Sequence, residues 1–190
     1  MPVGSGRTPV ARVRHPHQTE SVQLRARHKF PGTPTAVADI LFDPAFHTGL
    51  DLPDLSRPEV VEHTENGSER LLRLRYEFVG HLDPIARRLL AGRRLTWLQE
   101  LRLDRDRGMG RLTFAAEAEP NKLYGSAAVS LVAVDAPDGT ACTHRIVEGD
   151  LYVKVPLVGG TAERRIVPGL VARLDVEAAA LTAVLVASGP

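Results

Sequence analysis

Residues 59–79 read EVVEHTENGSERLLRLRYEFV, and their order of apolar, charged and turn residues points to one kind of local structure. Asn66-Gly67 separates two runs rich in Val, Leu and Tyr, and both residues tolerate a positive φ, which is typical of a tight hairpin turn. In the second run apolar residues alternate with charged ones, a period of two that indicates a half-buried strand. We therefore predict a β-hairpin formed by strands over Glu59–Glu65 and Glu69–Val79.

The same alternation recurs on both sides of this hairpin. Further strands are predicted over Glu20–Phe30, Arg93–Asp104, Gly110–Glu119, Gly125–Asp135 and Thr140–Val155. Two short helices are predicted directly after the first of these strands. Thr33 is a candidate N-cap before Pro34 at the first helical position, and Asp43-Pro44 ends that helix and begins another.

Residues Thr161–Ala187 form a predicted C-terminal helix, because their apolar members recur at three- and four-residue spacing as one stripe. At 1.5 Å per residue this helix is roughly 40 Å long, enough to cross a whole sheet. Strands joined by hairpin turns, with helices at the two ends, indicate an α+β fold. We expect a curved antiparallel β-sheet of about six to seven strands wrapped around the long C-terminal helix, with two short helices after the first strand.

Composition limits the class of protein. The chain has 190 residues, of which 43% are apolar and 25% charged, as in an ordinary soluble globular domain. Its single cysteine, Cys142, excludes an internal disulfide and a Cys-based zinc cluster. No apolar run reaches the roughly 18 residues of a spanning helix, and Met1–Glu20 lacks the apolar region of a signal peptide. We expect a cytoplasmic protein with no transmembrane segment.

Charge is distributed unevenly along the chain. The net charge is +1, but Arg7, Arg12 and Arg14 precede the first acidic residue, so the chain from Thr19 onward carries a small acidic excess. Nucleic-acid binders concentrate positive charge on their folded surface, so no nucleic-acid partner is expected. We predict one domain over residues 19–187, a disordered Arg/Pro/Gly-rich tail over 1–18 and a disordered end over 188–190. A monomer or weak homodimer is expected.

Two motifs carry a resemblance to a known family. They are DPAFH over Asp43–His47, after the first helix, and VKVPLVGGTAE over Val153–Glu163, entering the last helix. Together with the order of elements, they resemble the helix-grip fold of the START-like (SRPBCC) superfamily, and most closely an uncharacterised bacterial domain-of-unknown-function family within it. The resemblance spans Glu20–Ala187 and puts Glu177 on the polar side of the final helix. It implies a cavity between sheet and helix that holds apolar ligands in relatives, although a fold alone does not determine function.

Polar residues on apolar strand faces are the candidates for a binding site. His28, Tyr76 and Gln99 each share a face with Leu, Phe or Trp and would point toward the helix of a curled sheet. A buried polar group without a partner costs roughly 1–3 kcal/mol, so these groups must bond one another, the backbone or a ligand. With the apolar residues expected beside them, the predicted ligand-binding set is His28, Tyr76, Phe78, Trp97, Gln99, Phe114, Leu170 and Leu174.

Other motifs do not support a cofactor or a metal. His15-Pro16-His17 has chelate-like spacing but lies in the predicted tail without a third ligand nearby. Gly159-Gly160 is followed by Thr161-Ala162 and not by the Lys-Ser/Thr of a phosphate-binding loop, so it indicates a strand-to-helix turn. No cofactor and no metal are therefore expected.

Two functions remain after these exclusions. The favoured one is binding or transport of a small hydrophobic ligand, such as a lipid, isoprenoid or polyketide-like molecule, in the internal cavity. The alternative is a cyclase/aromatase-like enzyme in which His28, Tyr76 or Gln99 polarises a carbonyl or moves a proton. Catalysis needs at least two such groups converging on one substrate atom. Because the sequence predicts no such convergence and no acid inside, we favour binding.

Overall fold

The computed structural model describes residues 21–81, 92–136, 139–154 and 159–188. The predicted tail over residues 1–18, with His15 and His17, lies outside this range, as do residues 189–190. Within the described residues, a seven-stranded antiparallel sheet has the strand order β1-β7-β6-β5-β4-β3-β2. The elements in chain order are β1 (Val22–Pro31), α1 (Pro34–Leu41), α2 (Pro44–Gly49), β2 (Glu59–Asn66), β3 (Glu69–Glu77), β4 (Thr96–Asp104), β5 (Met109–Ala116), β6 (Leu123–Asp135), β7 (Ala141–Val153) and α4 (Gly159–Ala187).

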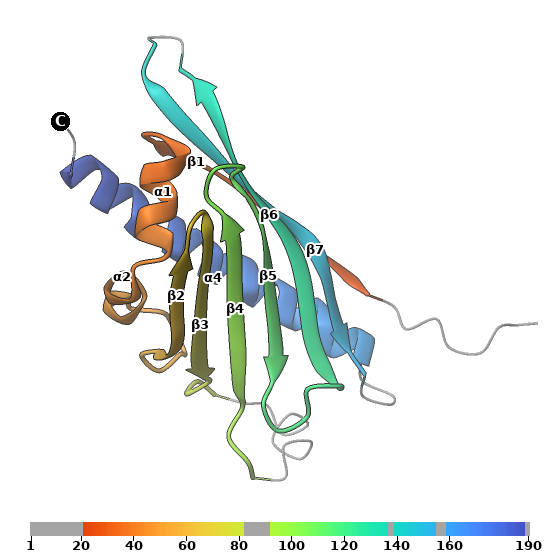
Figure 1. The fold of residues 1–190 in the computed structure, drawn as a ribbon. Coiled ribbons are helices and arrows are strands. Elements are labelled where there is room, and N and C mark those ends of the chain that lie inside the picture. Colours follow the sequence, from red (N-terminus) through yellow and green to blue (C-terminus); the bar gives the residue numbers. More distant parts are fainter. Residues whose placement is uncertain (1–20, 82–91, 137–138, 155–158, 189–190) are drawn as a thin grey trace, which may run out of the picture.

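The long helix α4 crosses one face of this sheet, and α1 and α2 lie near its C-terminal half (Figure 1). Each strand from β2 to β6 pairs with the next along the chain, whereas β1 pairs with β7 and so places the first strand beside the last. The predicted α+β helix-grip architecture is confirmed. The strands predicted over Arg93–Asp104 and Gly110–Glu119 are shorter than expected, because the pairing of β4 with β5 stops at Trp97 and Ala116.

Capping residues begin both short helices as predicted. The Thr33 hydroxyl accepts a hydrogen bond from the Ala36 amide at 3.2 Å, and the Asp43 carboxylate accepts one from the Ala45 amide at 2.8 Å. A proline follows each cap, where its missing amide hydrogen costs nothing. The two helices therefore begin at positions determined by local sequence.

The apolar faces of the sheet and of α4 form two hydrophobic clusters. The first lies with α1 and the C-terminal half of α4, and the second lies beneath the preceding turns of α4. The first cluster contains Phe30, Val37, Ala38, Leu41, Phe42, Leu52, Leu72, Leu74, Tyr76, Leu103, Leu131, Ala178 and Leu181. The second contains Leu24, Ala26, Leu112, Ala127, Val129, Val147 and Leu174.

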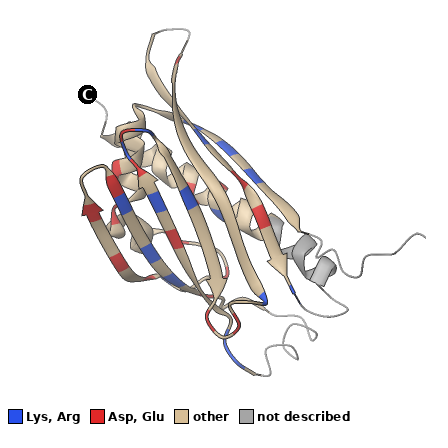
Figure 2. Ribbon diagram, turned by 45° about the vertical axis from the view of Figure 1, so that its right-hand side comes forward, with Lys and Arg blue, Asp and Glu red and all other residues tan. Residues whose placement is uncertain are grey.

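Charged residues lie at intervals along the strands (Figure 2), and on the face of the sheet opposite α4 they form ion pairs between neighbouring strands. Arg73 bonds Glu62 at 2.7 Å on one side and Glu100 on the other, across β2, β3 and β4. Such exposed pairs contribute little each, about 0–1 kcal/mol, but they keep the outer face hydrophilic. Among the described residues the buried charged side chains are Arg145, Arg173 and Glu177, together with Arg70, which pairs with Asp39 of α1 at 2.9 Å.

Gly149 of β7 lies close to the backbone of the neighbouring strand β6. It is paired with Leu24 of β1 and Ala127 of β6, and a Cβ at this position would lie 2.1 Å from the Ser126 carbonyl oxygen. We expect Gly149→Ala to lower the free energy of unfolding by about 1–3 kcal/mol in urea titrations, because the backbone must shift.

Gly169 of α4 provides the matched control for this substitution. A Cβ there meets nothing within 4 Å, so Gly169→Ala should stabilise the protein by up to about 1 kcal/mol through helix propensity. Equal stability of the two alanine variants would contradict the assigned close approach at Gly149.

Candidate functional site

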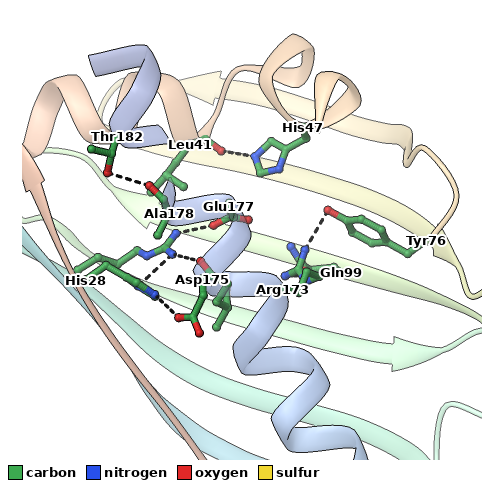
Figure 3. Close-up of polar contacts among 12 residues, drawn as sticks. His28, Leu41, His47, Tyr76, Gln99, Arg173, Asp175, Glu177, Ala178 and Thr182 are labelled. Atoms are coloured by element: carbon green, nitrogen blue, oxygen red, sulfur yellow. Dashed lines mark hydrogen bonds and ion pairs between the residues drawn. The ribbon is translucent and has the colours of Figure 1, made fainter. Parts of the chain in front are cut away.

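Charged side chains are buried between α4 and the sheet, together with polar residues that the sequence predicts on this face. Arg145 comes from β7, Tyr76 from β3 and Gln99 from β4, whereas Arg173 and Glu177 come from successive turns of α4. These five residues are called the buried charged cluster below. Across the helix–sheet interface, Glu177 bonds Arg145, and Arg173 bonds Tyr76 and Gln99 (Figure 3).

Arg145 and Glu177 form an ion pair at the centre of the cluster. They are 2% and 4% exposed, and Nη1 of Arg145 donates to Oε1 of Glu177. Burial alone would raise the pKa of Glu177, but attraction to Arg145 and Arg173 outweighs it and lowers this pKa to about 2. The expectation that Glu177 lies on the polar side of the last helix is wrong, because Glu177 faces the sheet and stays ionised there.

Arg173, which is 7% exposed, is held by neutral groups. Its Nη1 donates to the Tyr76 hydroxyl at 3.1 Å and its Nη2 donates to Oε1 of Gln99 at 2.5 Å. The guanidinium carbon lies 5.1 Å from the centre of the Tyr76 ring, a cation–π distance. Burial raises the pKa of Tyr76, so its hydroxyl stays neutral. Arg173 is thus a buried cation whose contacts are a phenol and an amide.

His28 connects the cluster to the protein surface. Its Nδ1 accepts from Nη2 of Arg145 at 3.2 Å, because an arginine can only donate, and its Nε2 therefore donates to Asp175 at 2.9 Å. The Asp175 side chain is 63% exposed, so the chain of contacts from Glu177 ends in solvent.

His47 of α2 faces the same interior region. Its Nε2 donates to the Leu41 carbonyl at 2.8 Å and so links the end of α1 to α2. Burial lowers the pKa of His47, which keeps the ring neutral. Nδ1 is then an acceptor, and it has no hydrogen-bond partner among the described residues.

A cavity of about 20 Å³ lies between the two hydrophobic clusters, which is room for about one water molecule. Within the described structure, three buried nitrogen atoms of the lining residues have no partner: Nδ1 of His47 and Nε of Arg145 and Arg173. Ligand sites of small-molecule binders are much larger, typically about 300–1,000 Å³. The cavity is lined by Leu41, His47, Leu72, Leu74, Gln99, Leu101, Leu112, Val129, Arg145, Val147, Arg173, Leu174 and Glu177.

Four of the predicted ligand-binding residues lie in or beside this cavity. Gln99 and Leu174 line it. Tyr76 and His28 do not, but each contacts an arginine that does. The three polar residues singled out on the apolar faces therefore all bond the charged network, although His28 lies apart from Tyr76 and Gln99.

The other four lie outside the cavity lining. Trp97 stacks on the tyrosine of the cluster, with ring centres 5.6 Å apart. Phe78 forms an isolated bridge beyond the end of β3, and Leu170 packs against the second hydrophobic cluster. Phe114 occupies the space above Gly125, where a Cβ would lie 2.2 Å from its ring.

Sequence reasoning missed the three charged residues of the cluster. Arg145 has the same parity as Val147 and Leu151 on β7, which was a readable signal for an inward position. Arg173 and Glu177 are four residues apart and follow the spacing of the apolar stripe of α4. The expectation of no acid in the interior is wrong, since Arg145 compensates the charge of Glu177.

Other kinds of site were sought in the same residues. No group of three or more His, Cys, Asp and Glu side chains within the described ranges could hold a metal ion. None of the helices described is both long and apolar enough to cross a membrane.

Residues 25–185 match the sequence model of a family described as "Protein of unknown function (DUF2505)". No curated protein matches the chain significantly.

Several solved structures share the fold. The protein TTHA0849 from Thermus thermophilus is 17% identical with a TM-score of 0.59, and the match covers 89% of this chain and 100% of that one. A START superfamily protein from Mycobacterium smegmatis is 14% identical with a TM-score of 0.51, covering 88% of this chain and 99% of that one. Ara h 8.0201 is 13% identical with a TM-score of 0.55, over 88% and 99% of the two chains. At these identities the likeness shows a START-like fold and nothing finer.

Proposed function

The chain belongs to the family of proteins of unknown function DUF2505, and from this premise and its START-like fold we propose that it binds a small hydrophobic molecule with a polar end between α4 and the sheet. The observation that carries the proposal is the set of three unpartnered nitrogen atoms on the cavity lining. Each buried polar group without a partner costs about 1–3 kcal/mol, so a polar ligand group that bonds any one of them gains that energy.

The remaining wall of the cavity suits an apolar ligand body. Leu72, Leu74, Leu112, Val129 and Val147 face the cavity from four strands of the sheet. An apolar body held there gains about 25 cal/mol for each Å² removed from water. One polar end beside an apolar wall is the usual composition of a small-molecule site.

The present cavity holds about one water molecule, so a ligand must widen the space between α4 and the sheet. Pro168 lies inside α4, five residues before Arg173, and it lacks the amide hydrogen that would bond the preceding turn. Bending of α4 therefore costs least at this point, on the side of the cluster nearer the start of the helix.

The first test is native mass spectrometry of the purified full chain, followed by organic extraction and identification of any released molecule. Decanol, a neutral amphiphile, is then titrated into a separate folded sample of the purified protein. Trp97 is the single tryptophan and stacks on Tyr76, so its fluorescence reports on the cluster. We expect a saturable change in Trp97 emission with decanol.

A pair of variants on β6 locates the binding. Val129→Phe fills the cavity and should weaken decanol binding at least about tenfold, whereas Val132→Phe, at a position 44% exposed, should leave it unchanged. Absence of both a released molecule and a saturable emission change would contradict the proposed function. Equal effects of the two variants would place the ligand elsewhere.

A further inference from the structure

We propose that the polar end of this ligand is a carboxylate and that Arg173 binds it. This inference rests on the proposed function and names the chemical class of its ligand. It starts from the balance of buried charges around the cavity. Two cations, Arg145 and Arg173, line it together with one carboxylate, Glu177.

Glu177 contacts only one of the two arginines. Its carboxylate bonds Arg145, and no ion pair within 4.0 Å joins Arg173 to any acidic residue of the described chain. A buried cation without a contacting anion has lost its hydration without full compensation. An anionic group beside Arg173 would restore neutrality in the cavity, which a neutral ligand group cannot do.

The hydrogen bonds of Arg173 leave one donor for such a group. Its two Nη atoms hold Tyr76 and Gln99, while its Nε has no partner among the described residues, and Arg173 lines the cavity. Carboxylates are the acceptors that guanidinium groups bind most strongly, through charge-assisted hydrogen bonds. Tyr76 and Gln99 hold the guanidinium in place, so little side-chain freedom remains to be lost on binding.

Arg145 is the weaker candidate for the same role. Its Nη atoms already bond Glu177, the Leu174 carbonyl and His28. An added carboxylate at Arg145 would therefore lie beside Glu177 and be repelled by it. Both arginines have an unpartnered Nε within the described structure, but Arg173 is the one that has no contacting anion there.

The decisive experiment compares acids with the alcohols of the same carbon skeleton at neutral pH. Decanoate and decanol form the aliphatic pair, followed by Trp97 emission, and naphthoate and naphthylmethanol form the aromatic pair, followed by calorimetry. We expect at least one acid to bind at least about tenfold more tightly than its alcohol, as a charged hydrogen bond in a buried site requires. The two pairs distinguish a fatty acid from an aromatic acid as the source of the carboxylate.

Variants assign the preference to one residue. Arg173→Gln should reduce the ratio of acid to alcohol affinity to within about twofold, while alcohol binding persists. Arg27→Gln is the matched control, because Arg27 is an exposed arginine paired with Glu148 on the outer face of β1 and β7. It should keep the ratio of the wild type. If Arg173→Gln does not fold, Arg173→Lys keeps the charge without the planar fork and should show an intermediate ratio.

Three outcomes would overturn the inference. Equal affinity for acid and alcohol in the wild type would contradict a carboxylate as the polar end of the ligand, while the proposed function would stand. This is the result expected if the polar part of the cavity holds water alone. A preference for the acid that survives in both Arg173 variants assigns the carboxylate to another group. Failure of all four compounds to bind contradicts the inference, and if no molecule is released from the purified chain either, it contradicts the proposed function as well.

Discussion

Replacing Glu177 by glutamine should lower the free energy of unfolding by about 3–5 kcal/mol, the cost of leaving one partner of a buried ion pair without its counter-charge. Glu177 is buried against Arg145, and both side chains are shielded from water by the two hydrophobic clusters. Glutamine keeps the size of the side chain and one acceptor oxygen, so the loss reports charge and not packing. Urea titration at neutral pH, monitored by Trp97 emission and by circular dichroism, measures it.

Asp175→Asn is the control on the same helix. Asp175 lies two residues earlier with its side chain 63% exposed, so its contact with His28 is screened by water and the change should cost less than about 1 kcal/mol. The double variant Arg145→Met, Glu177→Met removes both charges and should recover most of the stability lost in Glu177→Gln. A Glu177→Gln loss no larger than that of Asp175→Asn would contradict a buried pair.

The strand and helix layout was predictable because its signals are local. The alternation in Glu69–Glu77, the Asn66-Gly67 turn and the Thr33 cap each depend on residues within one element or its immediate neighbours. Even the inward positions of Tyr76 and Gln99 followed from parity. The helix-grip architecture follows once these elements are placed in order.

The charged cluster was not predictable in the same way. Arg145 and Glu177 are 32 residues apart, and their contact depends on how α4 is rotated over β7. Helical spacing alone put Glu177 as readily on the solvent side as on the stripe, because its neighbour Ala178 fits the stripe too. The cavity volume is even harder to predict from the sequence, because it depends on how Leu, Arg and Gln side chains fill the space between α4 and the sheet.

The same residues govern both stability and the proposed binding. Glu177 balances Arg145 in the absence of a ligand, while Arg173 relies on the dipoles of Tyr76 and Gln99. A ligand carboxylate would give each arginine its own anion. Binding of an acid should therefore raise the free energy of unfolding by the linkage expected for any ligand that binds only the folded state.

Acid should remove the contribution of Glu177 over a defined range of pH. The pKa of this carboxyl is about 2 in the folded protein and 4.5 in a solvated chain, so between these values the unfolded chain binds the additional proton. The contribution of Glu177 to the free energy of unfolding is therefore fully present above about pH 5 and is lost as the pH falls toward 2. The total loss is about 3 kcal/mol, and about two-thirds of it has occurred at pH 3.

Other groups titrate in acid, so the informative quantity is the difference between wild type and Glu177→Gln. His47, whose pKa burial lowers from 6.5, also removes stability as the pH falls, but that loss begins at higher pH. Attraction to Glu177 raises the pKa of His47, so in Glu177→Gln this loss extends to lower pH. The titration of the outer carboxylates Glu100 and Glu117 is common to both proteins. Urea titrations at successive pH values should show the two unfolding free energies converging between about pH 5 and pH 3. A difference that does not shrink as the pH falls over this range would mean that folding does not lower the pKa of Glu177, and the charge balance assigned to the cavity would then be wrong.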